Sequence, residues 1–148
     1  MRSLAEADGR RQILERLSRL APDSRPRWGS MSVGQMLCHL TDNMRMALGD
    51  IETRSKNKKL YQSFPVKKLV IHWLPWPKGV PTAPELLVTA PATFLADSDR
   101  LRALLERFGA EAAHANGRIH PLFGRLSASD WGVLQYRHFD HHLGQFGV

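Results

Sequence analysis

Apolar residues recur at intervals of three and four along four long stretches of the chain, the spacing that places them on one face of an α-helix. Two of these stretches begin with a serine followed three residues later by a side chain that can complete a cap, Ser32 with Gln35 and Ser127 with Asp130. Gly49 favours a helix end after the second stretch. We therefore predict four long helices, at residues 4–20, 32–48, 92–108 and 128–146.

The segment between the second and third predicted helices has no regular period. Residues 50–91 contain six prolines and two tryptophans, Trp73 and Trp76. Because a structureless loop of this length is uncommon in a compact domain, we expect a short helix near residues 61–73, then an extended crossover that packs its aromatic side chains on the bundle. No segment predicts a strand. The expected fold is all-α, with residues 1–148 forming a single domain, a four-helix bundle with a long irregular crossover between the second and third main helices.

The composition is that of an ordinary globular domain, with 43% hydrophobic residues. No apolar stretch is long enough to span a bilayer, and the N-terminus lacks the apolar core of a secretory signal. The single cysteine, Cys38, excludes an internal disulfide and a cysteine-rich zinc site. These features favour the cytoplasm.

The net charge of +7 raises the question of a nucleic-acid partner. Basic residues occur in the first predicted helix as well as in the crossover, where Lys56, Lys58, Lys59, Lys67 and Lys68 lie. No zinc finger, basic zipper or aromatic RNA-binding signature accompanies them. We interpret the charge as solvated surface and expect no specific nucleic-acid partner.

Two histidines near the end of the chain carry the clearest chemical signal. His138 and His142 are four residues apart, which on a helix means about 6 Å of rise and about 40° of rotation, so both imidazoles can reach one ion. Zinc proteases use the same spacing, but they need a Glu directly after the first histidine as general base. Phe139 occupies that position here, and Asp140 should point away from the ion. The protease interpretation is therefore excluded.

A catalytic zinc-like site usually needs a third protein ligand. His39 is the best candidate, because it lies in the second predicted helix beside Met36, Leu40 and Asn43 and should face the core or its rim. The alternative is that these histidines are hydrogen-bonded core residues. Spacing alone leaves both interpretations open.

Three pieces of the sequence resemble the DinB/YfiT-like superfamily, and more specifically a small branch of it known only as a domain of unknown function. They are RWGSMSVGQMLCHL, PTAPE and HPLFGRLSASDWGVLQYRHFDHHLGQFGV, with the middle piece the weakest. The resemblance implies a four-helix bundle in which one histidine of the second helix and two of the last hold a divalent metal ion. In this chain those residues are His39, His138 and His142. Zinc or nickel is the first expectation for the ion, and manganese or iron is compatible with imidazole ligands.

Other residues near these histidines have weaker expectations. His120 is a candidate substrate contact or proton carrier, although packing in its loop is the simpler interpretation. His141 should lie on the outer face of its helix, while Gln145 and Asn43 share faces with the ligands and are candidate hydrogen-bond partners for them. Cys38 is interpreted as a small buried hydrophobe.

Four further residues are interpreted as structural. Trp28 and Trp131 are predicted to anchor the core. Lys67 and Lys68 precede an apolar run at residues 70–76, which fits a segment packed on the bundle better than an amphipathic lid.

By resemblance, the leading functional hypothesis is a metal-dependent enzyme acting on a small molecule. Better-understood relatives include transferases and isomerases that use low-molecular-weight thiols, so a thiol cosubstrate is an expectation. Hydrolysis is the weaker variant, because no carboxylate is placed as an obvious base. A non-catalytic metal-binding or ligand-binding module is the alternative. The resemblance often goes with dimers, so a homodimer is also expected, although no self-complementary patch predicts one.

Overall fold

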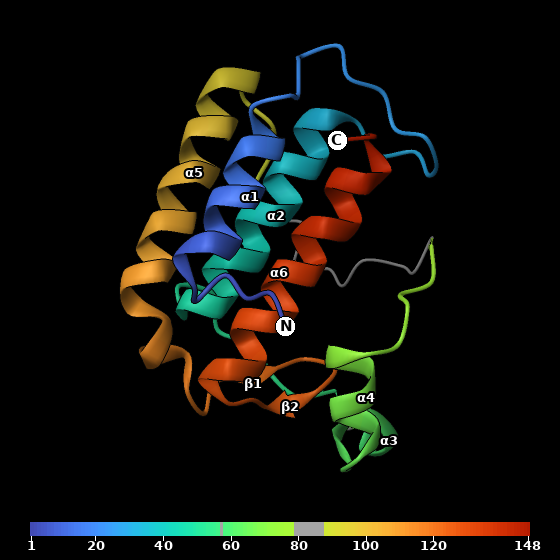
Figure 1. The fold of residues 1–148 in the computed structure, drawn as a ribbon, viewed down its shortest axis with the longest axis vertical. Helices are drawn as coiled ribbons and strands as arrows, with labels where there is room; N and C mark the ends of the chain where they lie inside the picture. Colours follow the sequence, from blue (N-terminus) through green and yellow to red (C-terminus); the bar gives the residue numbers. More distant parts are fainter. Residues whose placement is uncertain (57, 79–87) are drawn as a thin grey trace.

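The structure is a computed structural model that describes residues 1–56, 58–78 and 88–148. Four long helices form a bundle, with two short helices at one end of it (Figure 1). The long helices are α1 (Ala7–Leu17), α2 (Val33–Leu48), α5 (Phe94–Glu111) and α6 (Ala128–Gln145). The shorter elements are α3 (Lys59–Gln62), α4 (Val66–His72), the 3-10 helix η2 (Ala112–Ala115), and strands β1 (Ile119–His120) and β2 (Gly124–Arg125).

This architecture confirms the predicted all-α four-helix bundle, while two local expectations were wrong. The helix expected near residues 61–73 is broken into α3 and α4. Pro65 explains the break, since proline lacks a backbone N–H and disfavours a helical conformation for Phe64 before it. A strand pair was not predicted, yet β1 and β2 form a two-residue antiparallel ladder. Strands this short leave no periodic pattern in the sequence.

Helix α2 lies at the centre of the core. Thirteen of its 16 residues are buried, and it packs against both α5 and α6. Its ends are fixed as predicted. The Ser32 hydroxyl accepts from the Gln35 backbone N–H, the Gln35 side chain accepts from the Ser32 backbone, and Gly49 ends the helix with a φ of 84°. These caps set the position of every side chain along α2, including His39.

Helix α6 is fixed at its start in the same way, because Ser127 accepts a hydrogen bond from the backbone N–H of Asp130. Trp131 in its first turn is fully buried, which confirms it as a core anchor. Trp28 is only partly buried, so its prediction as a core residue was wrong. Among the described residues, no helix has the length and apolarity needed to cross a membrane.

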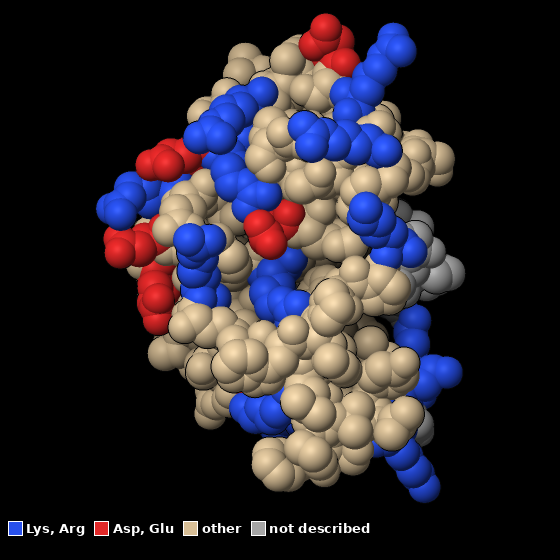
Figure 2. All heavy atoms as spheres, turned by 45° about the vertical axis from the view of Figure 1, so that its right-hand side comes forward, with Lys and Arg blue, Asp and Glu red and all other residues tan. Residues whose placement is uncertain are grey.

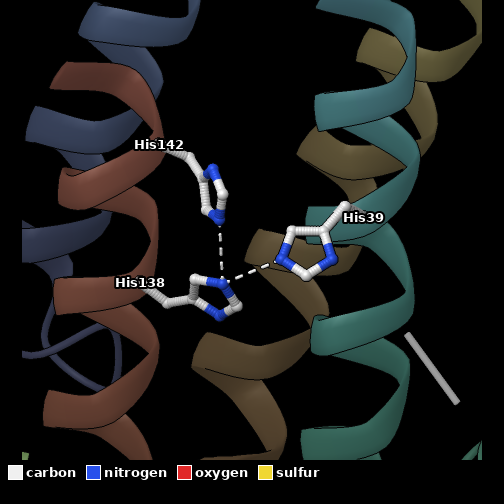
Figure 3. A group of neighbouring side chains, drawn as sticks. All are labelled: His39, His138 and His142. Carbon is white, nitrogen blue, oxygen red and sulfur yellow. Dashed lines mark hydrogen bonds between the residues drawn. The ribbon is translucent and has the colours of Figure 1, made fainter. Parts of the chain in front are cut away.

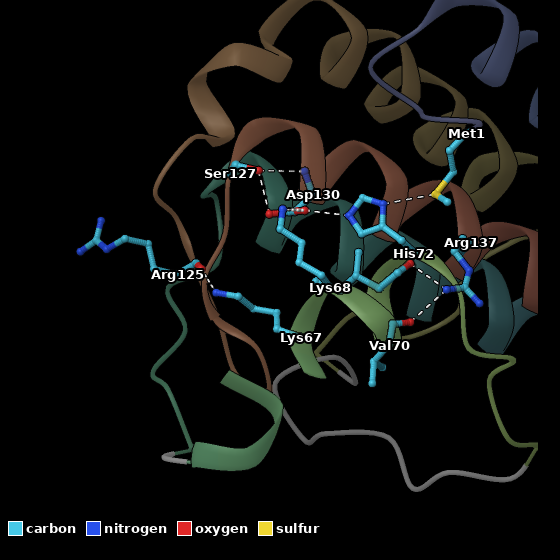
Figure 4. A network of polar contacts seen from close by, with 10 residues as sticks. Met1, Lys67, Lys68, Val70, His72, Arg125, Ser127, Asp130 and Arg137 are labelled. Atoms are coloured by element: carbon cyan, nitrogen blue, oxygen red, sulfur yellow. Dashed lines mark hydrogen bonds and ion pairs between the residues drawn. The ribbon is translucent and has the colours of Figure 1, made fainter. Parts of the chain in front are cut away.

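A polar network ties α4 to α6 (Figure 4). The Asp130 carboxylate accepts from Lys68 Nζ at 2.6 Å and pairs with His72 Nε2 at 2.8 Å. About two turns further along α6, the Arg137 guanidinium donates to the backbone carbonyls of Val70 and Ile71. A helix of seven residues is not stable alone, so these contacts position α4 on the bundle.

Asp130 should therefore make a pH-dependent contribution to stability. Burial raises the pKa of its carboxyl, but hydrogen bonds from Lys68, His72 and Ser127 outweigh that effect and bring the pKa to about 2. At pH 7, Asp130→Asn is expected to lower the free energy of unfolding by about 2 kcal/mol. Because the folded pKa lies below the unfolded value of about 3.9, this contribution is present above pH 4 and is lost as the pH falls toward 2.

Urea unfolding over a pH series measures this effect. The difference between wild type and Asp130→Asn should shrink steadily below about pH 4. Asp99→Asn, a change at an exposed position of α5, serves as the control and should leave stability within about 0.5 kcal/mol at every pH. If the free energy of unfolding of wild type exceeds that of Asp130→Asn by a constant amount down to about pH 2, the lowered pKa of Asp130 is contradicted.

Candidate metal centre

Three histidine side chains from two antiparallel helices converge in the bundle (Figure 3). His39 comes from α2, and His138 and His142 come from α6. His138 Nε2 lies 2.9 Å from His39 Nε2 and 3.1 Å from His142 Nε2. One potential ligand atom of each residue lies within 4.8 Å of those of the other two. The structure thus brings together the three histidines that the sequence singled out.

The spacing of these nitrogens suits a shared cation. An ion at about 2.0–2.1 Å from two imidazole nitrogens holds them about 2.9–3.4 Å apart for ligand angles of about 90–110°. The separations of 2.9 and 3.1 Å fall in this range. A single N–H on His138 could point well at only one of its two neighbours, whereas a cation accepts the lone pairs of all three rings. The donor set therefore fits a divalent metal ion.

The electrostatic environment keeps the rings of His138 and His142 neutral. Burial lowers the pKa of His138 well below its ordinary value, and the neighbouring His39 and His142 lower it further. Burial and His39 lower the pKa of His142 to about 4, against the opposite effect of its hydrogen bond with Gln145. His138 and His142 are therefore uncharged at neutral pH, which is the form that offers a lone pair to a metal.

Gln145 determines which nitrogen of His142 carries the proton. Its Nε2 donates to the backbone carbonyl of Trp28 at 2.8 Å, so its Oε1 is left to accept from His142 Nδ1 at 3.0 Å. A proton on Nδ1 leaves the Nε2 lone pair directed at His138. This contact supports the expectation that Gln145 orients a ligand, a role that such partners usually play in metal sites.

A scan against family models matches residues 7–146 to the DinB superfamily. The chain belongs to the DinB superfamily. Searches of the curated proteins and of the solved structures found no significant match. The family match includes both of the strongly resembling pieces of sequence, and the weaker piece, PTAPE, lies outside the described residues. The specific branch of the superfamily stays a prediction.

Aromatic side chains surround the three-histidine group of this DinB-superfamily chain. Trp76, from the crossover, lies with its ring centroid 5.8 Å from that of His138 and under the Arg137 guanidinium at 5.3 Å. Trp28 meets His141 edge to face at 4.7 Å. His141 itself lies outside the three-histidine group. The described part of the crossover thus packs directly beside His138, where it limits the access of water.

A pocket of about 280 Å³ opens beside His39. Its walls are the α2 residues Gln35 and Cys38 and the segment 88–91. Asp42 holds that segment in place, because its carboxylate accepts from the backbone N–H groups of Val88 and Thr89 at 2.7 and 2.8 Å. The pocket gives a small molecule a place next to the candidate metal ligands. Sequence analysis missed Asp42, although a carboxylate inside an otherwise buried helical stripe was a usable signal.

The remaining candidate residues have defined positions. His120 Nδ1 accepts from the backbone N–H groups of Leu122 and Phe123, and burial lowers the pKa of its imidazole to about 3. Its resting form is therefore neutral, and its role as a proton carrier stays a prediction. Cys38 is 3% exposed, and burial together with Asp97 raises the pKa of its thiol to about 11.

Asn43 is also buried, and its Oδ1 has no hydrogen-bond partner in the described structure, so its role beside the ligands stays a prediction.

The tautomer of His142 can be tested directly in metal-free protein. In long-range ¹H–¹⁵N NMR spectra at pH 6–7, His142 should show a protonated Nδ1 and an unprotonated Nε2, because its pKa is about 4. Gln145→Leu removes the acceptor of that proton and should give a mixture of tautomers. Gln12→Leu, a change on α1 at the partner of Tyr136, should leave the His142 signals unchanged. Protonated Nε2 in the wild type would refute the assigned orientation of Gln145.

Proposed function

We propose that His39, His138 and His142 bind one divalent metal ion, and that the site serves a metal-dependent enzyme acting on a small molecule. The observation that carries the metal proposal is the convergence of three imidazole nitrogens at separations of 2.9 and 3.1 Å about His138. Membership of the DinB superfamily is consistent with metal binding. Borderline-soft imidazole ligands favour zinc or nickel, with manganese or iron as further candidates.

The protein would supply three imidazole ligands, one of which, His39, also lines the pocket described above. When bound, an ion held by neutral imidazoles keeps its full charge and lowers the pKa of a coordinated thiol or water. Gln145 would hold His142 in its ligating tautomer, and Trp76 would exclude water on the side of His138. Gln35 and the segment 88–91 would contact the substrate.

Thiol-dependent group transfer is favoured over hydrolysis. Hydrolysis by an activated water is usually assisted by a nearby general base. The carboxylates that flank the site along the helices have other partners, since Asp140 pairs with Arg16 and Asp42 binds Val88 and Thr89. A low-molecular-weight thiol needs no such base when a metal ion lowers its pKa. The thiol cosubstrate thus belongs to the proposal, as does the small-molecule substrate.

The alternative is a metal-binding module without catalysis. Structural zinc is normally closed by four protein ligands. In the described residues the group of potential ligands contains three histidines, and the neighbouring Cys38 is not part of it. The open position favours a role in which a small molecule reaches the ion.

Metal content provides the first test. Untagged wild-type protein, loaded with zinc or nickel and desalted, should hold about one equivalent by elemental analysis. His39→Ala, His138→Ala and His142→Ala should each lose it, because two imidazoles bind such ions far more weakly than three. His114→Ala, at an exposed position on η2, is the matched control and should keep the full equivalent. Circular dichroism melting shows that each variant is folded.

The opposite result is equally clear. If wild type binds none of zinc, nickel, manganese and iron, the three histidines are core residues and the proposal is wrong. If the His114→Ala control loses metal as well, binding is unspecific.

A spectroscopic test separates the enzyme proposal from the non-catalytic module. Cobalt(II)-loaded wild type should develop a thiolate-to-metal charge-transfer band in the near ultraviolet on titration with glutathione or cysteine. The change should require a free thiol, so S-methyl glutathione is the control. A spectrum that does not respond to thiols, in protein with full metal content, would contradict the thiol-dependent function while leaving the metal site intact.

A further inference from the structure

The whole net charge of the protein is concentrated in one part of the crossover. Residues 53–78 contain seven Lys and Arg residues and no Asp or Glu. The other 14 basic residues of the chain are matched by its 14 acidic residues, all of which lie elsewhere. Residues 53–78 therefore carry a formal charge of +7 within 26 residues, and of their basic side chains Lys68 pairs with Asp130 of α6.

The same segment exposes large apolar side chains. Phe64 is 83% exposed, Trp73 72% and Leu60 65%. Leu74, Leu69 and Tyr61 are exposed by 47%, 44% and 38%. Single exposed apolar residues are common, but six within 15 residues of the chain mark an interaction site. We call these six residues, with Lys58 and Lys59 beside them, the α3–α4 face.

The α3–α4 face lies at one end of the molecule. Helices α3 and α4 lie beyond the lower end of the bundle (Figure 1), and this end of the molecule shows basic side chains among uncharged residues, with no acidic side chain in view (Figure 2). On their inner side the contacts to α6 are already used, through Asp130 and Arg137 (Figure 4). The exposed apolar side chains therefore contribute little to holding α4 on the bundle.

We propose that the α3–α4 face is a peripheral docking surface for negatively charged lipid bilayers. Apolar and aromatic side chains framed by lysines are the composition of segments that lie in the membrane interface: the apolar groups enter the headgroup region and the lysines are attracted to anionic lipids. Trp73 suits this location, because tryptophan rings favour the interface. The lysine stems can lie along the apolar layer while the ammonium groups stay in water.

Two other partners fit the α3–α4 face less well. Nucleic-acid contacts are dominated by basic and polar side chains, with aromatic stacking on single strands, and exposed aliphatic groups such as Leu60, Leu69 and Leu74 have no counterpart on a phosphate backbone. A second copy of the chain, docked symmetrically, would bring two strongly positive faces together. The combination of positive charge and aliphatic exposure favours an anionic bilayer.

Vesicle co-sedimentation of the full chain tests the proposal. We expect binding to phosphatidylcholine vesicles that contain phosphatidylglycerol, weak binding to phosphatidylcholine alone, and weaker binding to both as salt is raised. The double variant Phe64→Ser/Trp73→Ser should reduce binding by at least about tenfold, because two groups that enter the interface are lost. Lys58→Gln/Lys59→Gln should reduce binding to the anionic vesicles and leave the weak binding to neutral ones unchanged.

Matched control variants remove the same chemistry elsewhere. Leu95 on α5 is 70% exposed, so Leu95→Ser deletes an equally exposed apolar side chain outside the face. Arg19→Gln/Arg25→Gln removes two positive charges at exposed positions near the other end of the bundle. Both controls should bind the anionic vesicles as the wild type does. Circular dichroism melting shows that all variants are folded.

Three outcomes would overturn the proposal. One is the absence of binding to anionic vesicles at low salt. Another is an equal loss of binding in the control variants, which would make the attraction a property of total charge alone. The third is that the wild type does not bind vesicles but has another partner that is lost in Phe64→Ser/Trp73→Ser. Loss of binding to a single-stranded oligonucleotide would assign the α3–α4 face to nucleic acid. Loss of a concentration-dependent dimer in sedimentation velocity would assign it to a second copy of the chain.

Discussion

The rest of this structure depends on the close approach of three imidazole nitrogens between α2 and α6. His138 Nε2 lies 2.9 and 3.1 Å from its two neighbours, in surroundings that keep the rings of His138 and His142 neutral. Buried nitrogen lone pairs at such distances repel one another unless a proton or a cation lies between them. The helices must therefore be held firmly enough to maintain the group, and the capping box of α2 together with the dense packing around it provides that rigidity.

The three ligands are not equivalent. His142 is oriented by Gln145, which is itself fixed by the backbone carbonyl of Trp28, so a loop before α2 controls a residue on α6. Within the described part of the chain, the hydrogen-bond partners of His138 are the other two histidines, and its ring lies beside that of Trp76, which packs under Arg137. The site is thus shaped on one side by hydrogen bonds within the bundle and on the other by aromatic packing from the crossover. The pocket beside His39 lies between α2 and the segment 88–91.

The sequence predicted the parts of this arrangement that follow from local periodicity. These parts are the four helices, the capping box at Ser32 and the four-residue spacing of His138 and His142. Each of them depends only on residues within one helix. Placing His39 beside His138 and His142 required the further assumption that the helix of His39 faces α6, and the family resemblance supported that assumption. What was missed depends on contacts between distant segments: the clamp of Asp42 on residues 88–89, the partial exposure of Trp28, and the β1–β2 ladder. No local pattern encodes which segment a buried carboxylate will meet.

The crossover shows how one short segment can have two different surfaces. Helices of four and seven residues have no stability of their own in water. Here the contacts of Lys68, His72 and Arg137 hold α4 on α6, and α3 packs against α4. On the crossover, these contacts are made by the side chains of Lys68 and His72 and by backbone carbonyls, all on the side that faces α6. The exposed Phe64 and Trp73 are not needed for them, and polar residues at these positions would leave the attachment intact and the protein more soluble. Their apolar character, in the one segment that carries the whole net charge, is therefore explained by a partner outside the molecule and not by folding.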